Sequence, residues 1–304
     1  FNDTPEEVIF RKEVNDWLSA NATLKDSSAD SGYPGRGEED ALTVAKKWAA
    51  KLYDSGWACL HWPQEYGGRG STPIERVIWG QEASKYRIPG GFFEIGQGMA
   101  GPVLMMYATE EQKKRYLPPM AKGEEVWCQL FSEPGAGSDL AGLKTKAVLE
   151  GDTWIINGQK IWTSGAHYCD YGILVTRSDP SAQKHKGLTY FFIDMKSPGV
   201  ECRPIKQISG GANFNEVYFT DVKIPDEQRL GAVGDGWKVA LTTLMNERLA
   251  VGDASGPDFQ EAFNLACEHD LNGELAIKDG YVRDKLADWY CQSSGLKYTK
   301  YRNI

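Results

Sequence analysis

The side chains best suited to chemistry follow an apolar run that has the character of a strand. Residues 127–131 form this run, and the chain then enters a turn with two glycines and a proline, Ser132-Glu133-Pro134-Gly135-Ala136-Gly137-Ser138-Asp139. Glycine and proline end a strand, and glycine lets the backbone approach a ligand without a Cβ in the way. The two serine hydroxyls can bond polar ligand atoms. The turn matches neither the phosphate-loop pattern nor the Gly-x-Gly-x-x-Gly pattern, and an ordinary surface turn could have the same composition.

A second candidate segment lies further along the chain. Asn157-Gly158 stands between two alternating apolar runs, which is a strong signal for a β-hairpin turn. The second strand of such a hairpin ends in Trp162, Thr163 and Ser164. An indole beside two hydroxyls suits a flat heterocycle that exchanges hydrogen bonds with the protein. Trp162 could equally belong to the core, where aromatic side chains usually lie.

With both segments in view, the chain resembles the acyl-CoA dehydrogenase family. The resemblance continues, in the family's order, through the loop at residues 62–68, Thr109-Glu110-Glu111-Gln112-Lys113 and residues 217–225. It implies a helical N-terminal domain, a β domain and a C-terminal helical bundle, with FAD bound between the β domain and the bundle. It also implies a reaction, the α,β-dehydrogenation of an acyl-CoA thioester. In this reaction a carboxylate takes the α-proton, and the β-hydrogen leaves as hydride to the flavin.

The resemblance also assigns roles to individual residues. It implies that seven residues of the two segments bind FAD: Phe131, Ser132, Gly137, Ser138, Trp162, Thr163 and Ser164. The first two would face the flavin ring through backbone and hydroxyl, and Ser138 would lie closer to the acyl-CoA. Trp162 would pack against the flavin, while the two residues after it would bond the ring edge or the phosphates.

The candidate catalytic base is Glu247, in the sequence Asn246-Glu247-Arg248-Leu249 of an otherwise apolar helix. One branch of the family carries its base here, in a Glu-Arg-Leu sequence, and the other carries it far downstream. A dry pocket strengthens a carboxylate as a base toward carbon acids. The alternative is a solvated surface ion pair, because Glu and Arg usually lie in water. We expect Arg248, which points to another helix face, to be a structural residue or to contribute to the polarity of the substrate pocket, rather than to donate a proton.

Composition excludes several classes of protein. The formal charge of −8 argues against a nucleic-acid partner, which would call for a basic face. The six cysteines and four histidines have no metal-ligand spacing, so we expect reduced thiols and no metal site. No apolar run reaches the length of a membrane span, and the chain starts with an acidic helix signal rather than a leader peptide. Reduced thiols are typical of a cytoplasmic protein, and the segment around residues 282–287 looks like a bacterial subgroup of the family, so we expect a bacterial, cytoplasmic protein.

Hydrophobic periodicity divides the chain into three parts. Helical spacing and capping signals predict a helical domain over residues 1–122. Short alternating runs, punctuated by Gly, Asn, Asp and Pro, predict an antiparallel β barrel or sandwich over residues 123–232. Helical spacing returns over residues 233–304, with a break expected at Gly252 and Pro257. The sequence therefore predicts a multi-domain α+β protein.

Two features depart from the family pattern. Family members continue beyond the equivalent of Ile304 through further helices, so the C-terminal bundle looks cut short. Either residues are omitted or a partner covers the apolar stripes. The family's Arg-x-x-Phe-Gly sequence, which binds the FAD of a neighbouring subunit, is not evident at residues 271–277. We expect a homodimer or homotetramer, or a heteromer with a related subunit.

Three functional hypotheses remain open from the sequence. The first is an FAD-dependent acyl-CoA dehydrogenase that passes electrons to an electron transfer flavoprotein. The second keeps the fold but uses oxygen, as an acyl-CoA oxidase or a flavin monooxygenase. The third is a non-catalytic subunit of a heteromer. Glu247 favours catalysis, and the missing FAD sequence favours the subunit. The sequence does not define the length, branching or ring system of the acyl group.

Overall fold

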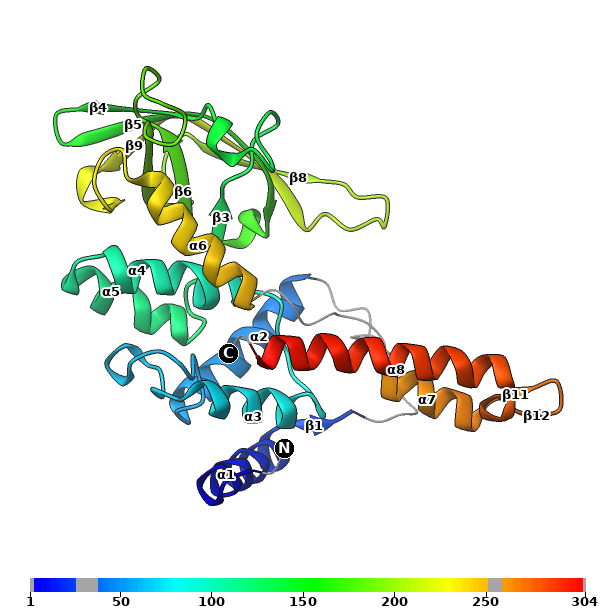
Figure 1. Ribbon diagram of the computed structural model, residues 1–304. Coiled ribbons are helices and arrows are strands. Elements are labelled where there is room, and N and C mark those ends of the chain that lie inside the picture. The colour runs from blue at the N-terminus through cyan, green and yellow to red at the C-terminus, as the bar shows by residue number, and fades with distance from the viewer. Residues whose placement is uncertain (1–2, 26–37, 251–258, 303–304) are drawn as a thin grey trace. The chain divides into compact units, whose positions relative to one another are not determined.

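The structure is a computed structural model, and its elements follow the order helices, sheet, helices (Figure 1). This order confirms the α+β fold class and the central, mostly antiparallel sheet expected from the sequence. The structure describes residues 3–25, 38–250 and 259–302. The expected break at Gly252 and Pro257 therefore lies outside the described residues.

The chain forms two compact units, which are described separately. The smaller unit consists of residues 1–40, 71–88 and 253–304. Its elements are α1 (Pro5–Asn21), β1 (Thr23–Leu24), α3 (Pro73–Ala83), β2 (Tyr86–Arg87), α7 (Phe259–Glu268), β11 (Asp270–Leu271), β12 (Glu274–Leu275) and α8 (Gly280–Tyr301). Thr4 and Thr72 each close a capping box, with proline at the first helical position, so the sequence itself starts α1 and α3.

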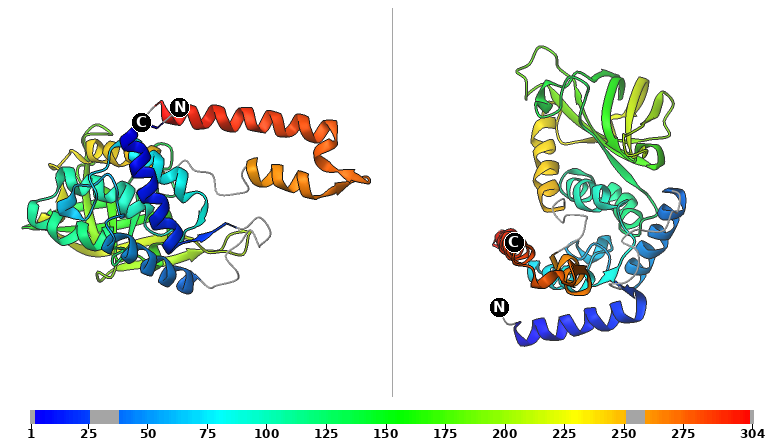
Figure 2. Two further views of the ribbon diagram at one scale, coloured as in Figure 1. Left: turned by 90° about the horizontal axis from the view of Figure 1, so that it is seen from below. Right: turned by 90° about the vertical axis from the view of Figure 1, so that its right-hand side faces the viewer.

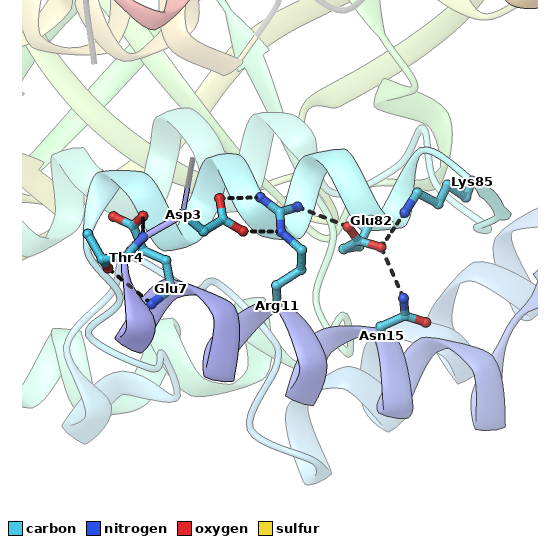
Figure 3. Close-up of polar contacts among 7 residues, drawn as sticks. All are labelled: Asp3, Thr4, Glu7, Arg11, Asn15, Glu82 and Lys85. Atoms are coloured by element: carbon cyan, nitrogen blue, oxygen red, sulfur yellow. Dashed lines mark hydrogen bonds and ion pairs between the residues drawn. The ribbon is translucent and has the colours of Figure 1, made fainter. Parts of the chain in front are cut away.

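A buried carboxylate joins α1 to α3 (Figure 3). Glu82 is 3% exposed and accepts hydrogen bonds from Arg11 at 2.9 Å and from Lys85 at 2.5 Å. Asn15 lies at 3.4 Å from the same carboxylate, and Arg11 also donates to Asp3 at 2.5 and 2.9 Å. Burial alone would raise the pKa of Glu82, but Lys85 and Arg11 hold that pKa below its usual value. The charged network thus fixes how the two helices pack.

The larger unit consists of residues 41–70 and 89–252 and contains most of the helices near the sheet. These are α2 (Glu38–Asp54, of which the unit takes the greater part), α4 (Gly101–Tyr107), α5 (Glu110–Ala121) and α6 (Gly236–Ala250). The helix expected around residues 98–107 is present, but its first part, Gly96–Ala100, is a π-helical turn. Thr109 closes the predicted capping box that starts α5.

The sheet of the larger unit has eight strands. They are β3 (Trp127–Leu130), β4 (Lys146–Glu150), β5 (Thr153–Ser164), β6 (Tyr171–Arg177), β7 (Leu188–Asp194), β8 (Val200–Ile205), β9 (Phe214–Pro225) and β10 (Arg229–Leu230). The strand order is β10-β7-β6-β4-β5-β9-β8, with β3 beside β6. Strands β3 and β4 pair with β6 in parallel, and the other pairs are antiparallel. Helices α4, α5 and α6 share one apolar cluster with the sheet, and α2 contributes to a second. The right-hand view of Figure 2 shows α6, in gold, against the green sheet.

The prediction of a hairpin turn at Asn157-Gly158 is wrong. Strand β5 runs without a turn through both residues, and the hairpin connects β4 to β5 at residues 151–152 instead. Gly158 has φ +154° beside a shift in register, and a Cβ there would lie 2.6–2.8 Å from atoms of Thr145. The glycine therefore permits a bulge and a close strand approach, which is the other reason for glycine inside a strand.

Candidate active site

A pocket of about 310 Å³ lies within the larger unit, beside β3, β5 and α6. It is lined by Gln129, Phe131, Ser132, Gly137, Ser138, Leu140, Ile161, Trp162, Trp237, Leu244 and Glu247. Six of these were expected at the site from the sequence: Phe131, Ser132, Gly137, Ser138, Trp162 and Glu247. The fold thus brings the two sequence segments and the candidate base to one cavity.

A buried ion pair holds the start of the glycine-rich turn. Lys160 of β5 is completely buried and donates to the carbonyl oxygen of Phe131 at 2.9 Å and to Glu133 Oε1 at 2.8 Å. The Glu133 carboxylate also accepts the backbone N–H groups of Lys144, at 2.6 Å, and Thr145, at 2.9 Å. The N–H of Ile161 donates to the carbonyl oxygen of the intervening serine at 2.9 Å. Three consecutive residues, of which the first two line the pocket, are therefore tied to β5.

Burial disfavours the charged form of both members of this ion pair, and their mutual attraction opposes that effect. Burial lowers the pKa of Lys160 to about 8, although the neighbouring carboxylate opposes the shift. Burial would raise the pKa of Glu133, but Lys160 and the backbone donors hold it below its usual value. Each group therefore offsets the cost of burying the charge of the other.

A bulge in β5 turns Trp162 out of the sheet. The register with β9 shifts between Lys160 and Thr163, and Trp162 has φ +60°, which is rare for a residue with a side chain. Trp162 is 57% exposed and lines the pocket. Its indole meets the ring of Phe214 edge-on, with 6.1 Å between the ring centroids. This placement excludes the alternative that Trp162 is a core residue.

Thr163 and Ser164 do not line the pocket. The hydroxyl of Thr163 is buried and has no hydrogen-bond partner among the described residues, while Asn215 donates to its carbonyl oxygen at 3.1 Å. Ser164 ends β5, pairs with Phe214 and is exposed. A buried hydroxyl without a partner next to an exposed indole suits a planar ligand with polar edges.

Helix α6 carries the candidate base into the pocket. Trp237, Leu244 and Glu247 are separated by seven and three residues, so they share one helix face, and all three line the cavity. Glu247 Oε2 accepts a hydrogen bond from Gln129 Nε2 at 3.3 Å. Arg248, expected at the substrate pocket, belongs to α6, but its side chain is outside what the structure describes.

Two pairs of hydroxyl groups fix α6 one turn before Glu247. Tyr190 of β7 and Thr243 are fully buried, and their oxygens lie 2.8 Å apart. Tyr107 of α4 lies 3.2 Å from the hydroxyl of Thr242. Because neighbouring residues of α6 are bonded to a strand and to another helix, the rotation of α6 about its axis is fixed.

Five lining residues were not predicted from the sequence: Gln129, Leu140, Ile161, Trp237 and Leu244. Two of them carried a readable signal. Gln129 is the single polar residue in the apolar run at 127–131, and Leu244 stands three residues before Glu247. The others reach the pocket through tertiary packing.

The described residues contain no group of three or more His, Cys, Asp or Glu side chains placed to bind a metal ion. Nor does any helix in the described ranges have the length and apolarity needed to cross a membrane.

Comparisons with known proteins agree on one family. The models for the N-terminal, middle and C-terminal domains of acyl-CoA dehydrogenases match residues 4–124, 128–222 and 234–304. Acyl-CoA dehydrogenase IpdE1 of Mycolicibacterium smegmatis is 39% identical over 288 residues, which are 91% of this chain and 72% of that protein. Two further curated acyl-CoA dehydrogenases, 45% and 42% identical, are longer, and the chain spans 33% and 62% of their lengths.

Solved structures give the same result. The ChsE4–ChsE5 complex from Mycobacterium tuberculosis aligns with a TM-score of 0.80 and 30% identity, over 99% of this chain and 76% of that chain. A protein named Tcur3481–Tcur3483 steroid ACAD aligns with a TM-score of 0.78 and 28% identity, over 99% and 76%.

Proposed function

Because the chain belongs to the acyl-CoA dehydrogenase family, we propose that it is an FAD-dependent acyl-CoA dehydrogenase whose catalytic base is Glu247. The observation that carries this proposal is the shared pocket, in which the Glu247 carboxylate lies with the glycine-rich turn and Trp162. Bound FAD would supply the acceptor for the β-hydride. The chain spans 33% and 62% of the lengths of two curated relatives, so the activity of those whole proteins comes to this chain as a proposal.

The proposed cofactor fits the residues that are present. The hydroxyl of Thr163, which follows Trp162 in the chain, is buried and has no hydrogen-bond partner among the described residues, and Ser132 lines the pocket. Both can hydrogen-bond the polar edge of a flavin, and the indole of Trp162 can pack against its face. We propose that Phe131 and Gly137 contact the cofactor and that Ser164 bonds its ring edge or phosphates.

The substrate side of the proposal rests on Glu247. Its carboxylate would take the α-proton of the thioester, so the Cα–H bond breaks and the electron pair stays on the substrate. Leu244 and Trp237 on the same helix face would exclude water from the carboxylate, and Ser138 would lie beside the acyl-CoA. We place Arg248 at this pocket as a source of polarity.

The comparisons also suggest a substrate and partners. The solved steroid ACAD makes a fused-ring acyl-CoA a candidate substrate, and the ChsE4–ChsE5 complex makes a heteromer a candidate assembly. We propose an electron transfer flavoprotein as the acceptor, as the family resemblance implies. An acyl-CoA oxidase or a flavin monooxygenase would differ only in how the reduced flavin reacts with oxygen.

The test is an anaerobic titration of the purified, flavin-loaded protein with butyryl-CoA, octanoyl-CoA, palmitoyl-CoA and a steroid acyl-CoA. We expect the flavin absorbance to be lost with at least one of them, and the enoyl-CoA product to appear by mass spectrometry. Fast re-oxidation in air would favour the oxidase. A protein that gains no flavin when FAD is added would contradict the proposal. So would a flavin that dithionite reduces and that none of these thioesters reduces.

A further inference from the structure

Gln129 is the polar exception in a buried strand. Its neighbours in β3, Cys128 and Leu130, are fully buried, whereas the Gln129 amide lines the pocket. Strand β3 pairs with β6 along its whole length, and Gln129 is in register with Ile173. The amide is therefore carried by a rigid part of the sheet.

Helix α6 is held in place by its contacts, but these contacts do not set the rotamer of the Glu247 side chain. The bonds of Thr242 and Thr243 to Tyr107 and Tyr190 stop one turn before it. A glutamate side chain still has three rotatable bonds, and its carboxylate can leave the pocket by rotating. Among the side chains that the structure describes, Gln129 is the hydrogen-bond partner of this carboxylate, at 3.3 Å.

We propose that Gln129 is a positioning residue that holds the Glu247 carboxylate against the substrate. Its amide binds Oε2, which leaves Oε1 to take the α-proton. The inference rests on the proposed function, because it requires Glu247 to be the base.

The chemical nature of the partner supports this role. A lysine or arginine in place of Gln129 would also orient the carboxylate, but its positive charge would favour the ionised form and weaken the base. A neutral amide orients the carboxylate without adding a charge to the pocket. Apart from Glu247, the described residues that line the pocket carry no charge, and Arg248, which we place at this pocket, follows Glu247 on another face of the helix.

The test measures abstraction of the α-proton separately from hydride transfer. With the flavin reduced beforehand by dithionite, the hydride has no acceptor, and the substrate can only lose its α-proton to Glu247 and regain a deuteron from D2O. Deuterium uptake into octanoyl-CoA, or into a steroid acyl-CoA if that is the better substrate, is followed by mass spectrometry. Flavin content, thermal midpoint and acyl-CoA affinity are measured on the same samples.

We expect Gln129→Leu to slow the exchange about 10²-fold, because a misplaced base about 1 Å away costs about that much. Leucine is close in size and suits an apolar strand, so flavin content, thermal midpoint and affinity should stay at the wild-type values. Gln129→Asn keeps the amide but withdraws it by one methylene. It should slow the exchange similarly and serves as the second variant if Gln129→Leu does not fold. In a Glu247→Gln background, Gln129→Leu should cause no further loss.

Three results would overturn the inference. Exchange at the wild-type rate in both Gln129 variants, with Glu247→Gln inactive, overturns the role of Gln129 and leaves the proposed function intact. A further loss in the double variant shows that Gln129 does not act through Glu247. Exchange at the wild-type rate in Glu247→Gln overturns the proposed base, and the inference fails with it.

Discussion

At the scale of single residues, the shape of the glycine-rich turn depends on Lys160. Its ammonium group is fully buried and donates hydrogen bonds to the carbonyl oxygen of Phe131 and to the carboxylate of Glu133. The sequence contained this lysine within the second segment but gave it no role. A lysine inside an apolar strand is rare unless it is paired, and that rarity is the signal that could have identified it.

We predict that Lys160→Met lowers the free energy of unfolding by about 3–5 kcal/mol, because it leaves the Glu133 carboxylate buried without its counter-charge. Urea unfolding followed by tryptophan fluorescence measures the change. Lys144→Met is the control, since the Lys144 side chain is exposed and only its backbone N–H binds Glu133. A change below 1 kcal/mol for Lys160→Met, equal to the control, would show that the pair does not stabilise the turn.

Sequence reasoning found some of the pocket residues within contiguous motifs, and their role in binding FAD stays a prediction. Ser132, Gly137 and Trp162 lie at the pocket because a strand or its following turn delivers each of them. It missed Gln129, whose hydrogen-bond partner Glu247 lies 118 residues further along the chain. A contact of this kind follows from the way α6 packs on the sheet, which the local sequence does not encode.

At the scale of elements, β5 shows how a local signal can mislead. Asn-Gly usually closes a hairpin, but here it lies inside a strand that is paired on both sides, with β4 and β9. Two ladders of hydrogen bonds outweigh the preference of one dipeptide. The sequence predicted a hairpin turn at this glycine, whereas the glycine lies at a register shift inside β5.

We predict that Gly158→Ala destabilises the protein by about 1–3 kcal/mol, because its Cβ would meet the Cα of Thr145 at 2.7 Å. The same shift would disturb the bond from the N–H of Thr145 to Glu133. Gly135→Ala is the matched control, since nothing lies within 4 Å of a Cβ at that position and its φ is not positive. Thermal midpoints of both variants test this, and equal midpoints would argue against a close strand contact at Gly158.

Asp226, in the short segment between β9 and β10, should make the stability of the protein depend on pH in the acid range. Hydrogen bonds from Arg229 and then from Trp154 lower the pKa of Asp226 to about 2. A lowered pKa in the folded state contributes stability that is present above about pH 4 and is lost as the pH falls through 2.

Asp226→Asn should therefore reduce the free energy of unfolding by about 1 kcal/mol at neutral pH, a value lowered because the side chain is 37% exposed and screened by water. The difference from the wild type should shrink between pH 4 and pH 2. Urea unfolding at several pH values measures it. A difference that is the same at pH 7 and pH 2 would contradict an electrostatic origin.

At the scale of the whole molecule, the sequence predicted the order of helices and sheet because each part repeats its own hydrophobic period. The smaller unit leaves large apolar side chains exposed on α8: Tyr281, Trp289, Tyr290, Leu296 and Tyr298. Exposed apolar surface of this extent usually meets another surface. Nothing in the periodicity of a single chain identifies that surface.

We predict that the purified, flavin-loaded protein is an oligomer, as a homomer or with a related subunit. The exposed side chains of α8 and the likeness to the ChsE4–ChsE5 complex support this. Light scattering after size-exclusion chromatography over a range of concentrations tests it, alone and after co-expression with a related subunit from the same genome. A stable monomer at micromolar concentration in both preparations would contradict it.

The most direct test of the whole account is the rate of anaerobic flavin reduction by acyl-CoA in Glu247→Gln. The substitution keeps the size and hydrogen bonding of the side chain and removes the base, and a general base typically contributes about 10²–10⁴-fold. We expect the rate to fall by at least about 10²-fold, with flavin content and acyl-CoA affinity unchanged, and Glu247→Asp to retain part of the activity. Flavin reduction at the wild-type rate in Glu247→Gln would show that Glu247 is not the base.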